Sequence, residues 1–478
     1  MVSNGVQIVW FRRDLRLFDN PALHSACKEK NNILCLYILD EKNARPMGSA
    51  QKWWLHHSLI ALNKSLKQIG LNLSLHQGCT LDIFKKIIKD NNISAINFNT
   101  VFEPEQLAID AKLEQLCTTN DIQQNTFHSN VIISPDKILN GQNEPYKVFT
   151  SFYKKATTYV STSKVIKTPT QAQPYPLTTP KSESLQDWAL CPKKPNWANN
   201  FKDYATPGEI GAQQALQDFM ENSLSEYKQG RDFPEPNHSS RLSAHIHFGE
   251  ISLNQTRQKA VQQQQIEKMH SANIECFIRQ LYWRDFSYYL LFHNDNLPKR
   301  NFNKKFDNFP WKNSKAKLKK WQTGQTGYPI VDAGMRELWH TGYMHNRVRM
   351  ITASFLTKHL LIHWKKGEEW FWDTLLDADL ANNVCSWQWV QGCGADAAPY
   401  FRIFNPTLQG EKFDPDGVYV KKWIPELSKL GNKYIHTPWL APKNILSQAN
   451  ITLGHDYPCP IVDHKEARIL ALESYKNI

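Results

Sequence analysis

Short apolar runs alternate with longer segments of helical periodicity over the first 134 residues. The runs VQIVWF, ILCLYIL, LNLSLH and ISAINF have the length and composition of strands. Between them lie SAQKWWLHHSLIALNKSLKQIG, LDIFKKIIKDN and EPEQLAIDAKLEQLC, whose apolar residues recur at the spacing of an amphipathic helix. Strands that alternate with helices predict an α/β domain with a parallel, Rossmann-like sheet over residues 1–134. This part contains no G-x-G-x-x-G, so a dinucleotide site of that type is not expected there.

The rest of the chain divides where its composition changes. Residues 135–207 are rich in Pro, Thr, Ser and Lys, as in VIKTPTQAQPYPLTTPKSES, and are expected to form an inter-domain linker. From residue 208 to residue 478 almost every segment has helical periodicity, which predicts an all-helical domain. A chain of 478 residues exceeds one ordinary core, in agreement with two domains.

Charge and cysteine content narrow the classes of function. The net charge of +12 suits a polyanionic partner such as nucleic acid, although charge also serves solubility. The nine cysteines form no C-x-x-C pair and no zinc spacing, so we expect reduced thiols, a cytosol-like compartment and no metal site. The longest apolar runs are too short to span a membrane.

The stretch ANNVCSWQWVQG, residues 381–392, contains two tryptophans one residue apart, Trp387 and Trp389. On a helix such a pair points to nearly opposite sides, whereas on a strand the two rings share a face. A helix would place Asn383 and Trp387 on one face and Trp389 on another. For any single tryptophan, a place in the core is the simpler interpretation.

Residues 239–243, SSRLS, group three hydroxyls around an arginine where a helix is expected to begin. Hydroxyls, backbone N–H groups and a helix N-terminus together suit a diphosphate. A serine N-cap is the simpler alternative.

The segment MHNRVRM, residues 344–350, carries two arginines that would face different ways on a helix. One of Arg347 and Arg349 can therefore pair inside the protein while the other reaches a partner. Asp377 and Asp379 are available counter-charges for the buried one. Ordinary surface salt bridges, which are common and weak, are the alternative.

Two further segments combine aromatic and polar groups. Residues 299–320 contain nine Lys or Arg and one acid, Asp307, around Trp311, which suits a phosphate backbone or, equally, a solvated helix face. In FIRQLYWRDF, residues 277–286, Gln280 and Arg284 would share a helical face with Trp283 close by. An amide beside an aromatic ring is what a base-binding pocket needs, whereas a core aromatic is the simpler interpretation.

Taken together, these motifs resemble one family. WFRRDLRLFDNPAL near the N-terminus is similar to the opening of the photolyase/cryptochrome family. The motifs YKQGRDFP, SSRLS, QLYWRDF, TGYPIVDAGMRELWHTGYMHNRVRMITASFL, DADLANN, WQWVQG and DAAPYFRIFNPTLQGEKFD continue that resemblance in the family's order. The resemblance covers nearly the whole chain and is strongest to the bacterial class I cyclobutane pyrimidine dimer photolyases.

The resemblance implies a carbon–carbon lyase in which the helical domain holds FAD in a bent shape. A light-excited, fully reduced flavin gives one electron to a dimer flipped out of UV-damaged DNA, the ring splits, and the electron returns. Arg349 and Asp377 resemble the ion pair beside the isoalloxazine, and Asn383 matches the position beside flavin N5, where a neutral amide favours the reduced flavin. The implied cofactor contacts are Tyr227, Ser239, Ser240, Arg241, Leu242, Ser243, Phe277, Arg284, Arg349, Asp377, Ala378, Asp379 and Asn383.

The same resemblance assigns roles to the tryptophans and to a set of DNA contacts. Trp387, Trp364 and Trp311 resemble the family's electron relay, with Trp311 at the surface. The implied contacts with damaged DNA are Arg231, Gln280, Trp283, Asn346, Arg347, Met350, Trp389 and Gln409. Gln280 and Asn383 are also implied to act in catalysis.

Two departures from the family pattern bear on the lesion. Class I dimer photolyases usually have glutamate at the position of Gln280 and tryptophan at that of Phe277. Six-four photolyases have glutamine at the first of these positions, but they carry a catalytic histidine pair where this chain has Asn346 and Met350. We therefore expect repair of cyclobutane dimers. Ser239 stands for the more usual threonine, a mild change.

Three other functions are weighed against repair of cyclobutane dimers. A cryptochrome, which signals without repair, is disfavoured by Asn383, by the retained Trp283, Met350 and Trp389, and by a chain that stops soon after its last helical pattern. A six-four photolyase is disfavoured by the missing histidines. A flavoprotein that does not use light would not need the spaced Trp364 and Trp387.

The remaining expectations concern the second chromophore and the surroundings of the protein. Asn99 and Glu103 are candidate contacts for an antenna pigment, for which methenyltetrahydrofolate is preferred over a deazaflavin, and an empty site is the third possibility. We expect a monomer that is not attached to a membrane. The expected compartment is the cytoplasm, with nucleoid association in a bacterium and the nucleus as the alternative.

Overall fold

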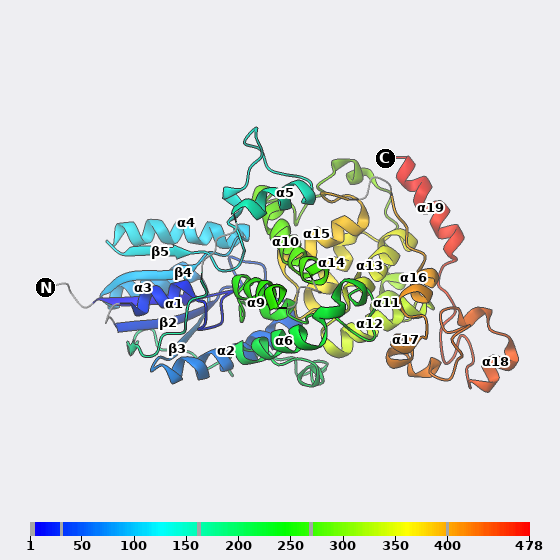
Figure 1. Cartoon of the computed structure of the whole chain (residues 1–478), viewed down its shortest axis with the longest axis horizontal. Helices are drawn as coiled ribbons and strands as arrows, with labels where there is room; N and C mark the ends of the chain where they lie inside the picture. Colours follow the sequence, from blue (N-terminus) through cyan, green and yellow to red (C-terminus); the bar gives the residue numbers. More distant parts are fainter. Residues whose placement is uncertain (1–4, 29–31, 160–163, 267–270, 398–400) are drawn as a thin grey trace. The chain divides into compact units, whose positions relative to one another are not determined.

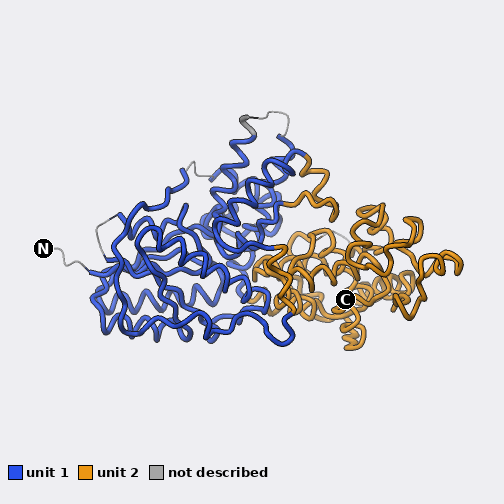
Figure 2. The backbone as a smooth tube through the Cα atoms, turned by 90° about the horizontal axis from the view of Figure 1, so that it is seen from below, with its two compact units in different colours: residues 1–196, 205–225, 240–295 blue, residues 197–204, 226–239, 296–478 orange. Residues whose placement is uncertain are grey.

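The computed structural model describes residues 5–28, 32–159, 164–266, 271–397 and 401–478. They form two compact units that interleave along the chain (Figure 2). Unit 1 consists of residues 1–196, 205–225 and 240–295, and unit 2 of residues 197–204, 226–239 and 296–478. The units therefore do not follow the three consecutive segments expected from composition, and the functional domain boundaries 1–134, 135–207 and 208–478 stay a prediction.

Unit 1 contains a parallel sheet in the order β3-β2-β1-β4-β5, with the short β6 paired to β2 (Figure 1). The apolar runs predicted as strands are β1 to β4, and β5 was missed because QQNTF is polar. The strands are β1 (Val6–Phe11), β2 (Asn32–Leu39), β3 (Leu73–Gln77), β4 (Ile93–Asn99), β5 (Gln123–Phe127) and β6 (Gln173–Pro174).

Helices cover this sheet, and their apolar faces explain why β1, β2 and β4 are rich in apolar residues. Alternate residues of β1 (Val6, Ile8 and Trp10) pack in one cluster with residues of α3 and α4 such as Phe84 and Leu113. The strand residues between them are also buried, as a parallel sheet requires. The helices of unit 1 are α1 (Pro21–Cys27), α2 (Ser49–Gln68), α3 (Thr80–Asp90), α4 (Pro104–Thr119), α5 (Phe149–Ala156), α6 (Glu209–Asn222), α8 (Ser243–His247), α9 (Leu253–Ile266) and α10 (Ser271–His293).

Unit 2 is helical over its described residues, as the periodicity after residue 208 predicts. Its longer helices carry most of the motifs, and a π-helical turn (Phe355–His359) follows α13 directly. The helices are α7 (Tyr227–Gly230), α11 (Lys315–Gln322), α12 (Pro329–Thr341), α13 (Asn346–Ser354), α14 (Trp364–Thr374), α15 (Leu380–Gln391), α16 (Pro406–Phe413), α17 (Val418–Trp423), α18 (Lys443–Gln448) and α19 (His464–Lys476).

The expected α/β domain and helical region are therefore confirmed. The predicted linker contains the short helix α5, which the proline-rich composition around it concealed. Among the described residues, no helix combines the length and apolarity that crossing a bilayer would take.

Candidate functional site

A partly buried ion pair joins α13 to the segment that precedes α15. Arg349 Nη2 donates to Asp377 Oδ2 at 2.9 Å, and Arg349 Nε donates to the Met344 carbonyl at 2.7 Å. Burial acts to lower the pKa of Arg349, but the charge and hydrogen bond of Asp377, together with Tyr343 and Glu337, outweigh burial and raise it. Arg347 is paired as well, with Asp232, and the two arginine side chains are 19% and 23% exposed, so pairing and burial alone do not single out Arg349 as the internal arginine.

The N-terminal turn of α15 fixes two of the predicted polar groups. Asp379 is its N-cap and accepts from Asn382 N at 2.8 Å, with Ala378 buried beside it. The Asn383 amide donates through Nδ2 to the carbonyl and the carboxylate of Glu368, at 3.1 and 2.8 Å. Two acceptors on one side orient this amide with Nδ2 toward Glu368 and its oxygen away from it. Sequence reasoning missed Glu368, which lies four residues after Trp364 on α14.

Tyr343 links two residues that the resemblance assigns to the cofactor. Its hydroxyl lies 3.1 Å from Ser239 Oγ, and the Arg349 guanidinium lies 5.5 Å from its ring centroid. Tyr343 was not predicted, although it stands in the same motif as Arg349. Tyr227, at the start of α7, is buried, with the Arg231 guanidinium 5.5 Å from its ring centroid.

The remaining residues of the SSRLS motif belong to unit 1. Ser240 Oγ accepts from Leu242 N at 3.4 Å, and Arg241 adopts a positive φ of 55°. The helix begins at Ser243 as expected, but its N-cap is Leu242, without a side-chain cap. The alternative of a serine N-cap is therefore wrong.

Helix α10 carries the other predicted residues of unit 1. The Trp283 ring stacks on Phe149 of α5, with centroids 3.7 Å apart and planes 8° from parallel. The Gln280 amide donates weakly to the Cys276 carbonyl at 3.4 Å, so it stays close to its own helix. One face of the predicted lesion-stacking ring is therefore backed by a second aromatic ring.

Two further α10 residues have internal contacts. Arg284 donates to the Asn130 carbonyl at 2.6 Å, and its guanidinium lies 4.6 Å from the Tyr288 ring centroid. Phe277 is buried against Phe219 of α6, with centroids 4.7 Å apart. These contacts hold α10 within unit 1, and the assigned cofactor roles of both residues stay predictions.

The three predicted relay tryptophans lie along α15, α14 and the loop before α11. The Trp387 ring packs so closely on α14 that a side chain at Gly367 would overlap it. Trp364 is fully buried at the start of α14, and its Nε1 donates to Asn301 Oδ1 at 2.8 Å. Trp311 is partly exposed, as a terminal relay position requires. Trp387 also contacts Trp321, a buried ring that was not predicted, with centroids 6.2 Å apart.

The first two turns of α13 hold three of the predicted DNA contacts, Asn346, Arg347 and Met350. Asn346 is exposed, and its amide lies 3.9 Å from the Met350 sulfur one turn along the helix. Arg347 Nη2 pairs with Asp232 at 2.8 Å, and its guanidinium lies 4.4 Å from the Phe413 ring centroid. Gln409, a further predicted contact, lies on α16 and is half-buried.

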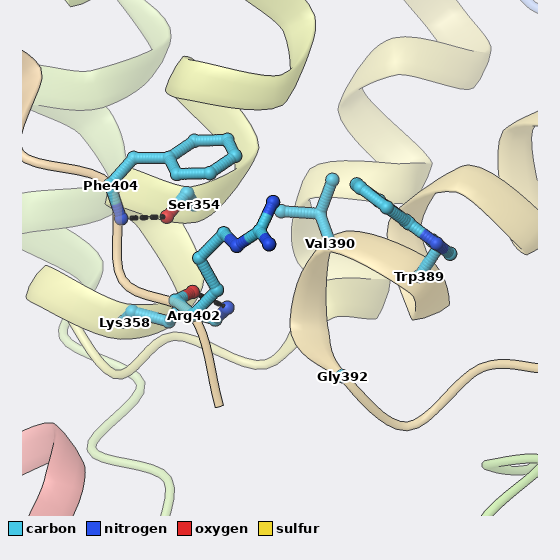
Figure 3. Close-up of a pocket in the computed structure, with 7 residues that line it drawn as sticks. All are labelled: Ser354, Lys358, Trp389, Val390, Gly392, Arg402 and Phe404. Carbon is cyan, nitrogen blue, oxygen red and sulfur yellow. Dashed lines mark hydrogen bonds between the residues drawn. The ribbon is translucent and has the colours of Figure 1, made fainter. Parts of the chain in front are cut away.

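Trp389 lines a small pocket of about 20 Å³ within unit 2 (Figure 3). Two cationic side chains, Lys358 and Arg402, line the same pocket, and the Lys358 ammonium donates to the Arg402 carbonyl. Burial, reinforced by Arg402, lowers the pKa of Lys358 to about 7. Trp387 is buried and Trp389 only partly so, which agrees with the opposite directions expected for them on a helix.

The candidate antenna contacts lie at the carboxyl end of β4. The Asn99 amide donates to Asp14 Oδ2 at 2.6 Å and to Asn20 Oδ1 at 2.9 Å, inside a buried network. Glu103 is also buried, immediately before α4. Asn99 therefore holds the loop after β1 in place through hydrogen bonds.

Among the described residues, no cluster of three or more His, Cys, Asp or Glu could hold a metal ion.

Comparison with known proteins agrees with this geometry. Residues 7–176 match the DNA photolyase family, and residues 277–477 match the FAD binding domain of DNA photolyase. A deoxyribodipyrimidine photo-lyase of Agrobacterium fabrum is 46% identical over 475 residues, which cover 98% of each chain. The chain belongs to the photolyase/cryptochrome family.

Two other relatives define the range of this similarity. Cryptochrome-2 of Arabidopsis thaliana is 35% identical over 97% of this chain and 77% of its own. A crystal structure of a bacterial class III photolyase from Agrobacterium tumefaciens superposes with a TM-score of 0.96 at 45% identity, covering 100% of this chain and 98% of its own. The family prediction is confirmed, and with a class III relative this similar, the preference for class I stays a prediction.

Proposed function

We propose that this family member is a light-driven DNA repair enzyme that splits cyclobutane pyrimidine dimers. The observation that carries the proposal is the pairing of Arg349 with Asp377 at the base of α15, the helix that also bears Asn383 and Trp387. The relatives named photo-lyase support the same reading.

FAD fits the residues that unit 2 contributes. Bound FAD, once reduced and excited by light, supplies the single electron that repair requires. A fixed positive charge on Arg349 favours a negatively charged partner, and the Asn383 amide, held through Nδ2 by Glu368, is neutral where a carboxylate would add repulsion. Neither group has to reorient when charge develops. In our proposal Tyr227, Ser239 and Asp379 hold the cofactor together with Ser240, Arg241, Leu242, Ser243, Phe277, Arg284 and Ala378.

The substrate is UV-damaged DNA, bound through cations and aromatic rings. We propose that Arg231 and Arg347 contact phosphates, that Asn346, Met350 and Gln409 contact the strand near the lesion, and that Trp283 and Trp389 stack on the flipped dimer. The Phe149 ring stacks on Trp283 and restricts the orientation of this proposed stacking ring.

The residues present favour repair of cyclobutane dimers over two alternative functions, a six-four photolyase and a cryptochrome. A six-four photolyase needs imidazoles for acid–base chemistry, and Asn346 and Met350 supply none. A cryptochrome that only signals has no use for the lesion-stacking rings Trp283 and Trp389. Because Cryptochrome-2 of Arabidopsis thaliana is also similar to this chain, a signalling photoreceptor is the second candidate function.

The antenna pigment is the least constrained part of the proposal. We retain methenyltetrahydrofolate in preference to a deazaflavin. Because Asn99 Nδ2 already donates to Asp14 and Asn20, a pigment that leaves this network intact would have to donate to the buried Oδ1 of Asn99, which has no hydrogen-bond partner among the described residues. Extraction of the purified protein, followed by chromatography of the released pigments against both standards, distinguishes the two chromophores.

The decisive experiment uses an oligonucleotide that carries one cyclobutane dimer. We expect purified protein to contain FAD in stoichiometric amount and, once reduced, to split the dimer into its two pyrimidines under blue light and not in the dark. Colourless protein that cannot be reconstituted with FAD would refute the flavin assignment. Flavin-loaded, reduced protein that binds the damaged strand without repairing it would favour the cryptochrome.

A further inference from the structure

We propose that His363 is a positioning residue of the outer step of the tryptophan relay, where its ring forms the contact between Trp364 and Trp311. The inference rests on the proposed function, because it requires the relay to supply electrons to the flavin. His363 is the residue before α14.

Ring distances carry the proposal. The His363 centroid lies 4.9 Å from the Trp311 ring and 5.6 Å from the Trp364 ring, within the range of direct aromatic contact. The imidazole therefore touches both partners of the last electron transfer, one of them fully buried and the other partly exposed.

Hydrogen bonds fix His363 and the Trp311 loop to each other. His363 N donates to Asn313 Oδ1 at 3.0 Å, and Lys312 N donates to the Leu361 carbonyl at 2.8 Å. The imidazole is also the N-cap of α14, since its Nδ1 accepts from Lys365 N at 3.1 Å. One residue thus ties the helix that begins with Trp364 to the loop that carries Trp311.

The neutral imidazole of His363 suits a position beside Trp311, which carries a transient positive charge when it is oxidised. Burial and the neighbouring Lys365 lower the pKa of His363 to about 4. Lys366 adds to this effect, whereas Glu369 and Asp307 oppose it. Nδ1 acts as an acceptor in the cap, so the ring is neutral with its proton on Nε2. A neutral ring adds no repulsion when Trp311 becomes positively charged.

The step itself moves one electron. It passes from Trp311 to oxidised Trp364, so that Trp364 becomes neutral again and Trp311 becomes a radical cation. A thiol reductant in solution then returns one electron to Trp311. His363 exchanges no electron or proton in this scheme and acts through the geometry of its two neighbours.

Two substitutions at His363 separate the contribution of its aromatic ring from that of its N-cap hydrogen bond. His363→Phe keeps an aromatic ring and loses the cap acceptor, whereas His363→Asn keeps an N-cap side chain and loses the ring. Flavin content and the thermal midpoint of each purified variant show that it has folded. Trp364→Phe serves as the control that interrupts the relay.

Transient absorption after a laser flash on protein with oxidised flavin then measures the yield of oxidised Trp311, and steady illumination with dithiothreitol measures photoreduction. We expect His363→Phe to resemble wild type and His363→Asn to lose both signals severalfold. Wild-type yields in His363→Asn, or equal losses in both variants, would overturn the proposal.

Failure of the proposed function would give a different result, because wild type with chemically reduced flavin would then not repair dimers. Unchanged photoreduction in Trp364→Phe would refute the relay itself and, with it, the role of His363.

Discussion

Arg349 and Asp377 are bonded at 2.9 Å, with 23% of the arginine side chain and 5% of the aspartate side chain exposed. Arg349→Ala would leave the Asp377 carboxylate buried opposite a missing cation, at a cost of about 3–5 kcal/mol. We therefore expect flavin occupancy to fall severalfold, measured as the ratio of flavin to protein absorbance after purification. Arg349→Lys keeps the charge and should retain more flavin than alanine does. Full occupancy in Arg349→Ala would separate the ion pair from cofactor binding.

Trp387→Phe tests the division between photoreduction and repair. Removing the first relay ring should abolish photoreduction of oxidised flavin under blue light with dithiothreitol. Repair that starts from chemically reduced protein should continue, because in our proposal the repair electron comes from the flavin and not from the relay. Loss of both activities to the same extent, in protein with normal flavin content, would contradict this division.

Arg347→Ala tests the electrostatic part of DNA binding. Because Lys and Arg contacts release counterions from phosphates, we expect the affinity for dimer-bearing DNA to fall steeply with salt. Loss of a single phosphate contact should weaken binding to damaged and undamaged DNA alike and reduce the slope of log affinity against log salt by about 1. Asp232→Asn, which removes the partner of Arg347 and keeps the cation, is the matched control. An unchanged slope in Arg347→Ala would exclude the contact.

Gln280→Glu tests the departure from the class I pattern. A glutamine amide can donate to a thymine carbonyl but cannot transfer a proton, so it stabilises developing charge only as a fixed dipole. Wild type should therefore repair dimers with a modest quantum yield, and the glutamate should raise that yield. Both proteins should be inactive on six-four lesions. Wild type that repairs six-four lesions and leaves dimers intact would make the lesion assignment wrong.

Asp285 provides a test in which stability depends on pH. Burial raises the pKa of this fully buried carboxyl to about 7, although Arg284 and hydrogen bonds from Ile132 N and Ile133 N oppose the shift. The folded state therefore binds the proton more tightly than the unfolded state does. The stability that this proton confers is complete below about pH 4 and is lost as pH rises through about 7.

Asp285→Asn removes this titration. The free energy of unfolding of the variant, relative to wild type, should increase between pH 4.5 and pH 8, by at most about 4 kcal/mol for a shift of about three pKa units. Urea unfolding of both proteins at the two pH values measures the difference, and effects of other titrating groups cancel in the comparison. A difference that does not change with pH would mean that Asp285 is ionised throughout.

The α/β fold could be predicted because β1 to β4 have apolar residues at consecutive or alternate positions and the helices between them have regular periodicity. Polar QQNTF gave no such signal, so β5 was missed, as was α5 among prolines and threonines. At the site, the residues alone left open which arginine pairs with Asp377 or Asp379, and the family resemblance identified the pair Arg349–Asp377. Tyr343, Glu368 and His363 were missed because contacts between residues as much as 104 positions apart leave no periodic trace.

The interleaving of the two units bears on how the chain can be divided. The six segments of the two units alternate, so the backbone passes between them five times. The longest segment of each unit, made alone, would lack helices that the other segments supply: residues 1–196 would lack α6, α8, α9 and α10, and residues 296–478 would lack α7. Even the matched FAD-binding region, which begins at residue 277, cuts α10 in two and omits Tyr227 and Ser239. Circular permutants and split versions of this protein should therefore be sought at loops within one unit, with both halves present as the chain folds.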